Sequence, residues 1–129
     1  AEQATAGESL AGEDLHGLDL SGLTLAGANL SGANLDGANL SGADLTGAKL
    51  DEANLNQTKL VGAKLQKAIF QGASLTAADL SQANAAGALF AGARMAGADL
   101  SGAQLEQAIL KDALLVGAKA AGVQAPATI

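Results

Sequence analysis

A strict period of five residues constrains the fold of this chain more than any other feature. The stretch from Leu25 to Leu50 reads LAGANLSGANLDGANLSGADLTGAKL, in which Ala, usually Asn or Asp, then Leu, a small residue and Gly recur in register. From position 10 to position 115 the same register holds Leu at 18 of 22 fifth positions. Two residues earlier, from position 28 to position 118, Ala occupies 18 of 19 positions. A period held this strictly indicates an architectural repeat.

The period of five excludes one long helix and one long strand. Five residues of an α-helix advance the direction of the side chain by about 140°, so the leucines would not form one apolar stripe. A strand points residues two apart to the same side, which lets each Ala and the following Leu face inward together. Because five is odd, a continuous strand would send successive leucines to opposite faces. The conflict disappears if the chain turns a corner once in every pentad.

The residues at the expected corners support this interpretation. Gly occupies the second position after the inward residue in 15 of 22 pentads, and Gly adopts turn conformations that are closed to other residues. Asn and Asp, which hydrogen-bond to nearby backbone in turns, often precede the inward residue, at Asp14, Asp19, Asn29, Asn34, Asn39, Asp44, Asn54, Asp79, Asn84 and Asp99.

A second, longer spacing indicates how many pentads make one coil. The bulky apolar residues Ile69, Leu89 and Ile109 stand just before the inward position at intervals of 20, and Phe70 and Phe90 are also 20 apart. If four pentads make one coil, these residues stack above one another. The prediction is a square tube of about five to six coils that pair in parallel about 4.8 Å apart.

The pattern resembles the pentapeptide repeat family, whose consensus is A(D/N)Lxx, over roughly residues 17–122. The resemblance implies an all-β fold, a right-handed quadrilateral parallel β-helix. It also places the central residue of each pentad inside, and we expect a structural core that includes Leu30, Leu50, Phe70, Phe90 and Leu110. The expected organisation is an N-terminal cap or frayed segment over residues 1–16, the β-helix over 17–122 and a tail over 123–129.

Four positions depart from this pattern. Thr58 replaces an inward Ala, and Ala85 would leave a hole between Leu65 and Leu105 that Phe90 partly fills. Leu18 and Leu23 are larger than the Ala expected there, and they could plug the open end of the first coil.

Composition limits the class of protein. At 129 residues the chain is one domain, and it has no Cys, which excludes disulfides and thiolate metal sites. No apolar run reaches the ~18 residues of a membrane span. The chain starts at Ala1 without Met, and its small polar first residues resemble the start left by signal-peptide cleavage. We therefore expect an exported protein of the bacterial periplasm or thylakoid lumen.

The sequence contains no recognisable catalytic set. His16 is the only His, and with Asp14 and Asp19 it offers too few converging ligands for a metal. No base is placed to activate the recurring serines, and the glycine spacing does not match a phosphate loop. We expect no enzyme activity, no cofactor and no metal.

A row of apolar residues is the candidate partner-binding surface. Under the four-pentad arrangement, Ile69, Leu89 and Ile109 lie on one outward face, and Leu114 and Val116 lie on the adjoining face. Exposed apolar patches mark interfaces, although a fold of the tail over them would explain the same residues. The principal hypothesis is a non-enzymatic interaction module, a rigid rod that presents flat faces to a protein partner or, by an end or a face, to a second copy.

The family resemblance suggests an alternative. Some pentapeptide repeat proteins resemble B-form DNA and bind type II topoisomerases, protecting gyrase from inhibitors. A rod of about 26 Å would need roughly 15 acidic charges to match the charge density of DNA, whereas this chain has 13 acidic and 7 basic residues. Its acidic net charge argues against direct nucleic-acid binding. A third hypothesis is ice binding by a face of serine hydroxyls, but Lys59 and Val61 interrupt the regular array that such binding needs.

Overall fold

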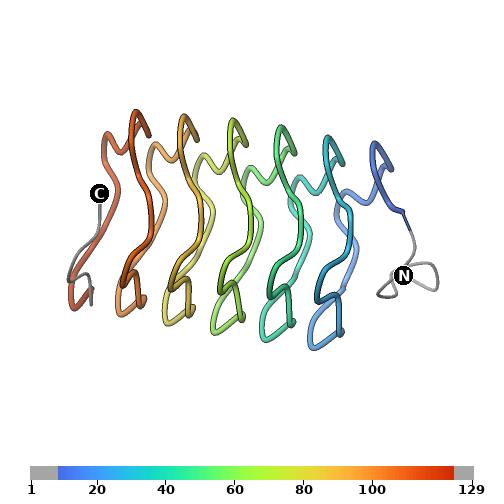
Figure 1. Cartoon of the computed structure of the whole chain (residues 1–129), viewed down its shortest axis with the longest axis horizontal. Helices are drawn as coiled ribbons and strands as arrows, with labels where there is room; N and C mark the ends of the chain where they lie inside the picture. Colours follow the sequence, from blue (N-terminus) through green and yellow to red (C-terminus); the bar gives the residue numbers. More distant parts are fainter. Residues whose placement is uncertain (1–8, 124–129) are drawn as a thin grey trace.

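The chain winds into a right-handed quadrilateral β-helix, as expected from the sequence. The computed structural model describes residues 9–123. Its coils stack side by side along one axis, and the first and last coils lie at opposite ends of the tube (Figure 1). Every parallel bridge joins a residue to the residue 20 positions later, from Ser9↔Asn29 to Asp99↔Lys119. The prediction of four pentads per coil is therefore confirmed.

Regular strands and helices are absent from residues 9–123, because each face of the tube is only one bridge residue wide. The repeating unit of five is a bridge residue, an inward residue, a two-residue turn and a second inward residue that is usually Ala. In the pentad of Leu50, the Leu50 N–H donates to the Ile69 carbonyl of the next coil at 2.7 Å, and the Lys49 N–H donates to the Ala28 carbonyl of the preceding coil at 2.9 Å. The backbone of an inner coil is thus bonded to both neighbours.

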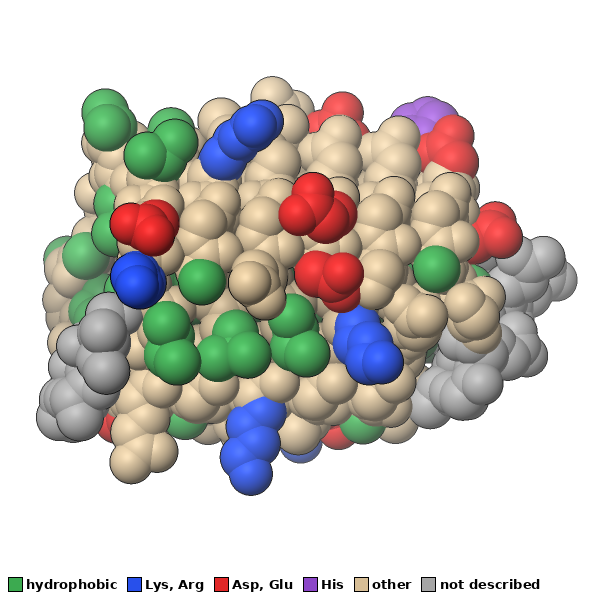
Figure 2. Space-filling view, turned by 45° about the horizontal axis from the view of Figure 1, so that its top comes forward, with side chains coloured by type: hydrophobic (Ala, Val, Ile, Leu, Met, Phe, Trp, Pro, Cys, Tyr) green, Lys and Arg blue, Asp and Glu red, His purple; other side chains and the backbone are tan. Residues whose placement is uncertain are grey.

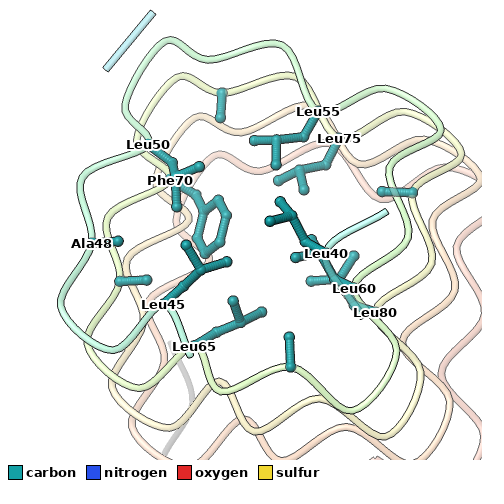
Figure 3. Close-up of a cluster of buried hydrophobic side chains, with 14 of the residues drawn as sticks. Leu40, Leu45, Ala48, Leu50, Leu55, Leu60, Leu65, Phe70, Leu75 and Leu80 are labelled. Atoms are coloured by element: carbon teal, nitrogen blue, oxygen red, sulfur yellow. The ribbon is translucent and has the colours of Figure 1, made fainter. Parts of the chain in front are cut away.

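The four faces are named here by their central residues. Face 1 holds positions 10, 30, 50, 70, 90 and 110, and face 2 holds 15, 35, 55, 75, 95 and 115. Face 3 holds 20, 40, 60, 80 and 100, and face 4 holds 25, 45, 65, 85 and 105. Side chains from the four faces converge on the axis of the tube (Figure 3).

The core is a set of stacked columns of like side chains. Leu30, Leu50, Phe70 and Phe90 are fully buried on face 1, and the two rings stack with centroids 4.9 Å apart and planes 5° apart. Leu110 differs from the expected core residues: it is only partly buried and packs against the core near its end. The last coil has no complete coil above it among the described residues, which explains the difference.

The departures at positions 58 and 85 are both accommodated inside the tube. Thr58 is fully buried, and its hydroxyl donates to the Leu35 carbonyl at 2.7 Å. A buried hydroxyl with a partner does not carry the penalty of an unpaired one. Ala85 is also buried, in the column of Leu65 and Leu105.

The tube begins before the boundary expected from the sequence. Ser9 and Asp14 already form bridges to the next coil, and Leu10 and Leu15 are buried. Residues 9–16 are therefore part of the first coil rather than a separate segment. Leu18 and Leu23 are partly buried and pack against the core in this coil. At the other end Val123 packs against the core, and the expected role of the tail falls on residues 124–129, outside the described part of the chain.

The corner residue adopts a left-handed backbone conformation in every pentad of the described coils, from Gly12 to Gly122. Gly fills most of these corners with φ near +70°, as at Gly92 with φ 69°. Seven corners hold another residue with φ between 60° and 62°, at Glu52, Gln57, Lys67, Ala77, Gln82, Gln107 and Asp112. The coil geometry thus imposes a positive φ even where the sequence does not favour one.

Candidate functional site

Three apolar side chains form a row on the outside of face 1. Bridges join Ile69 to Leu89 and Leu89 to Ile109, so the three side chains occupy the same place on consecutive coils. This set is called the apolar row. Each member is partly buried, because its neighbours in the row cover it on one or both sides. Figure 2 shows a row of hydrophobic side chains running along the tube with a basic side chain at one end.

The backbone beneath the apolar row is held on both sides. The Leu89 N–H donates to the Ala68 carbonyl of the preceding coil at 2.9 Å, and the Phe90 N–H donates to the Ile109 carbonyl of the next coil at 2.7 Å. The stacked rings of Phe70 and Phe90 lie directly inside. The row is therefore a flat, stiff surface whose backbone groups are already used by the neighbouring coils.

The residues of the apolar row lack a side-chain hydrogen bond that stabilises the turn in many other pentads. All ten Asn and Asp residues at this place in other pentads accept a hydrogen bond from the backbone N–H two residues later, at 2.9 to 3.3 Å. Ile69, Leu89 and Ile109 have no side-chain oxygen and cannot do so. On face 1, three consecutive coils thus lack a local interaction that ten other pentads make.

A hollow of about 460 Å³ adjoins the row at Ile69. Lys49 continues the column of the row by its bridge to Ile69, and it is exposed. On the same side, Asp51 accepts a hydrogen bond from the Ser31 hydroxyl at 2.6 Å, and the Glu52 carboxylate lies above Gly72. Asn29 and Gln71 complete the lining. Among residues 9–123, Lys49 has no ion pair or side-chain hydrogen bond.

The other two predicted partner-binding residues belong to a separate surface. Leu114 and Val116 lie on face 2 near the C-terminal end, where they are 56% and 80% exposed. Leu115, an inward position by the repeat, is 38% exposed beside them. The structure therefore brings Ile69, Leu89 and Ile109 together but places Leu114 and Val116 elsewhere. The exposure of Leu115 depends on where the stack ends, which the repeat does not specify.

His16 lies at the opposite, N-terminal end of face 2, beside Asp14. His16 Nδ1 is 2.7 Å from Asp14 Oδ1, and both side chains are mostly exposed. The shared hydrogen bond raises the pKa of His16 and, from the other side, lowers the pKa of Asp14. The described residues include no group of three or more His, Cys, Asp or Glu placed to hold a metal ion. They also include no helix of the length and apolarity needed to cross a bilayer.

Comparison with solved structures places the fold among known relatives. The chain is 29% identical to HetL from the cyanobacterium Nostoc sp. strain PCC 7120, a pentapeptide repeat protein involved in heterocyst differentiation regulation. The match covers 92% of this chain and 75% of HetL, with a TM-score of 0.58. Rfr23 from the cyanobacterium Cyanothece 51142 is 28% identical, over 88% of this chain and 91% of Rfr23, with a TM-score of 0.46.

A third solved structure and the family description complete the comparison. A trypsin-treated variant of QnrB1, a plasmid-mediated fluoroquinolone resistance protein, is 23% identical over 95% of this chain and 89% of its own, with a TM-score of 0.48. No protein of curated function matches the sequence. The family of pentapeptide repeats matches in 8 copies over residues 14–51, 38–76 and 73–112. With most of its length matched in this way and its backbone wound in four-pentad coils, the chain belongs to the pentapeptide repeat family.

Proposed function

We propose that this protein is a non-enzymatic interaction module and that the apolar row on face 1 binds a protein partner. The observation that carries the proposal is the replacement of a turn-stabilising Asn or Asp by Ile or Leu in three consecutive coils. Each replacement removes a side-chain hydrogen bond to the backbone, worth on the order of 1 kcal/mol, and leaves apolar surface partly in water. Contact between neighbours in the row buries only part of that surface, and apolar surface of this kind is typical of interfaces.

The rigidity of the surface supports the same proposal. The backbone of the apolar row is bonded to the coils on both sides, and the stacked Phe70 and Phe90 support it from within. A partner would therefore meet a surface that needs no ordering on binding, which reduces the entropic cost of association. HetL, a relative with the same fold, is involved in the regulation of a differentiation process, a kind of role that interaction modules fill.

The charge pattern gives less support to mimicry of DNA and binding of gyrase. Bridges place opposite charges on neighbouring coils at Asp44↔Lys64, Lys59↔Asp79 and Asp99↔Lys119. Among the bridges of the described coils, Asp79↔Asp99 alone joins two acidic residues. A duplex instead presents an unbroken array of phosphates of one sign. A gyrase supercoiling assay with the purified chain is expected to show neither inhibition nor protection from a quinolone.

The proposal is tested by affinity capture with matched variants. The wild type, Leu89→Ser with Ile109→Ser, and the control Val61→Ser are immobilised and exposed to an extract of the source organism. Val61 is an exposed apolar residue on face 3, so its replacement removes a similar group from a different face. We expect a protein that the wild type and the control retain and that the double variant loses. Equal retention by all three would contradict the proposal.

Light scattering on the same variants separates the two kinds of partner. A dimer that the double variant dissolves would identify the partner as a second copy. A monomer throughout would leave the captured protein as a foreign partner. Circular dichroism should be unchanged in each variant, because no inward residue is altered.

A further inference from the structure

The column that contains the apolar row has four members, one basic residue followed by three apolar residues. Lys49, Ile69, Leu89 and Ile109 follow one another through consecutive bridges, so the column runs from a cation to three apolar groups. With coils about 4.8 Å apart, the last three members lie about 4.8, 9.6 and 14.4 Å from the first. A partner that contacts the whole column must present matching groups at this spacing.

An α-helix provides that spacing and a β-strand does not. Residues i, i+3, i+7 and i+10 of a helix share one stripe and lie about 4.5, 10.5 and 15 Å apart along its axis. Residues on one side of a β-strand recur about every 6.7 Å, so by the second contact their side chains no longer lie over the members of the column. A strand also gains no main-chain bonds on this face, because the N–H and carbonyl groups of Ile69 and Leu89 are already bonded to neighbouring coils.

The positive charge of Lys49, at one end of the column, sets the orientation of a partner that lies along the column. Lys49 lies in the column itself, is exposed and has no ion pair among residues 9–123. The two carboxylates that also line the hollow, those of Asp51 and Glu52, belong to the turn beside the column. A carboxylate of a partner that enters beside Lys49 would complete an ion pair next to the apolar contact with Ile69. An uncharged or basic group there would leave the lysine without a partner at the edge of an apolar interface, which costs affinity.

We infer that the apolar row binds an amphipathic α-helix that lies along the tube axis, with an acidic residue at Lys49 followed by an apolar stripe over Ile69, Leu89 and Ile109. This inference rests on the proposed function and specifies its partner. The hollow gives room for the acidic end of the helix, and the flat row receives the three apolar side chains of its stripe. The mode of binding is a helix laid on an apolar surface.

A designed peptide tests the inference without the natural partner. The probe is a fluorescein-labelled helical peptide of about 14 residues, stapled on its outer face because short helices are marginal in water. It carries a glutamate followed by leucines at the third, seventh and tenth positions after it. One control peptide has the same composition with the leucines spread around the helix, and a second has lysine in place of the glutamate. Binding is measured by fluorescence anisotropy.

We expect the glutamate probe to bind the wild type and the control Val61→Ser equally. Leu89→Ser should weaken binding by about tenfold, and Lys49→Glu should weaken it by about two- to fivefold, as for a partly exposed ion pair. The lysine probe should show the reverse preference and bind Lys49→Glu better than the wild type.

Three results would overturn the inference. They are the absence of binding at millimolar peptide, equal binding of the spread-leucine control, and no effect of exchanging the charges at Lys49. Each of these can occur while affinity capture still depends on the apolar row. In that case the proposed function stands and the helical partner is wrong. If capture does not depend on the row, the proposed function fails first.

Discussion

Each corner residue bends the backbone in the same way, whatever its side chain. At a positive φ near 60°, a residue with a Cβ is strained by about 1–2 kcal/mol relative to Gly, and seven corners carry this strain. The strain is tolerated because the hydrogen bonds on both sides fix the corner. At Ala77, for example, the N–H donates to the Ala96 carbonyl at 2.9 Å.

Exchange of Gly and Ala at corners should therefore change stability in opposite directions. Ala77→Gly is expected to raise the free energy of unfolding by about 0.5–1 kcal/mol, which is the relief of strain less the entropy gained by the unfolded chain. Gly92→Ala should lower it by a similar amount, since no atom lies within 4 Å of the added Cβ and only the backbone conformation opposes it. Urea denaturation measures both changes, and a loss of stability in Ala77→Gly would contradict the explanation.

The hydroxyl of Thr58 should contribute a measurable part of the stability of its coil. Thr58→Val keeps the shape of the side chain but removes the bond to the Leu35 carbonyl, and we expect a loss of about 1 kcal/mol. The carbonyl keeps its second bond, from the Ala38 N–H at 2.9 Å, so the loss should not reach the value for an unpaired buried group. Thermal unfolding with Thr58→Ala as a comparison checks this, and a loss of several kcal/mol would show that the carbonyl is left unpaired.

Aspartates in the turns should make stability depend on pH below neutrality. Hydrogen bonds from Ser21, Thr46 and Ser101 lower the pKa values of Asp19, Asp44 and Asp99, respectively. A carboxyl group with a lowered pKa in the folded state stabilises the fold above its unfolded pKa of about 3.9, and this contribution is lost as pH falls through the lower folded value.

Replacing the three aspartates by Asn should flatten that dependence. The amide oxygen still accepts from the turn N–H, as Asn39 does from Ser41 at 3.0 Å, but it does not titrate. The melting temperature of the triple variant should fall less than that of the wild type between about pH 5 and about pH 3. Asn39→Asp is the converse control and should fall more. Parallel curves for all three proteins would contradict this account.

Within one coil, the sequence predicts what lies inside and what lies at the corners. The period of five gives the inward Leu and Ala, and the spacing of Phe70 and Phe90 gives the number of pentads per coil. The hollow beside Lys49 could not be predicted in this way, because it depends on side-chain positions, such as that of Glu52 over Gly72. The periodicity predicts which residues share the column of Lys49 and the apolar row, but it does not predict the shape of the surface around that column.

A cavity should be costly in the middle of the stack and less so at its end. Leu45→Ala removes a fully buried side chain between two coils and should lower the free energy of unfolding by about 3 kcal/mol. Leu15→Ala, in the first coil and 6% exposed, should cost less because only one neighbouring coil among residues 9–123 packs against it. Urea denaturation of the two variants gives the comparison, and equal losses would contradict a core in which each coil depends on both neighbours.

Over the whole molecule, stability is a property of neighbouring coils rather than of one central core. Every described bridge joins a residue to its counterpart in the adjacent coil, so no bridge joins coils that are further apart. Inner coils are held from both sides and end coils from one. This arrangement also explains why the start of the tube was predicted too late. Glu13 occupies an inward Ala position, but it is exposed in the first coil of the described residues, where none of residues 9–123 forms a preceding coil over it.

Amide hydrogen exchange should follow this gradient. The slowest exchange is expected in the central coils, around Leu45 and Leu65, whose amides donate to the next coil at 2.8 and 2.7 Å. Exchange should become faster towards Ser9 and Val123 as fraying begins at the ends. Mass spectrometry of peptic peptides would show the gradient. Uniform protection along residues 9–123 would instead indicate that the tube opens only as a single unit.

The four-pentad coil also restricts how such a chain can change length during evolution or engineering. An insertion or deletion of four consecutive pentads adds or removes one coil and leaves every later side chain on its original face. Loss of a single pentad between Ile69 and Leu89 preserves the repeat and the core, yet it moves Leu89 and Ile109 to the adjoining face and divides the row. A surface that spans several coils is therefore inherited only through length changes in whole coils.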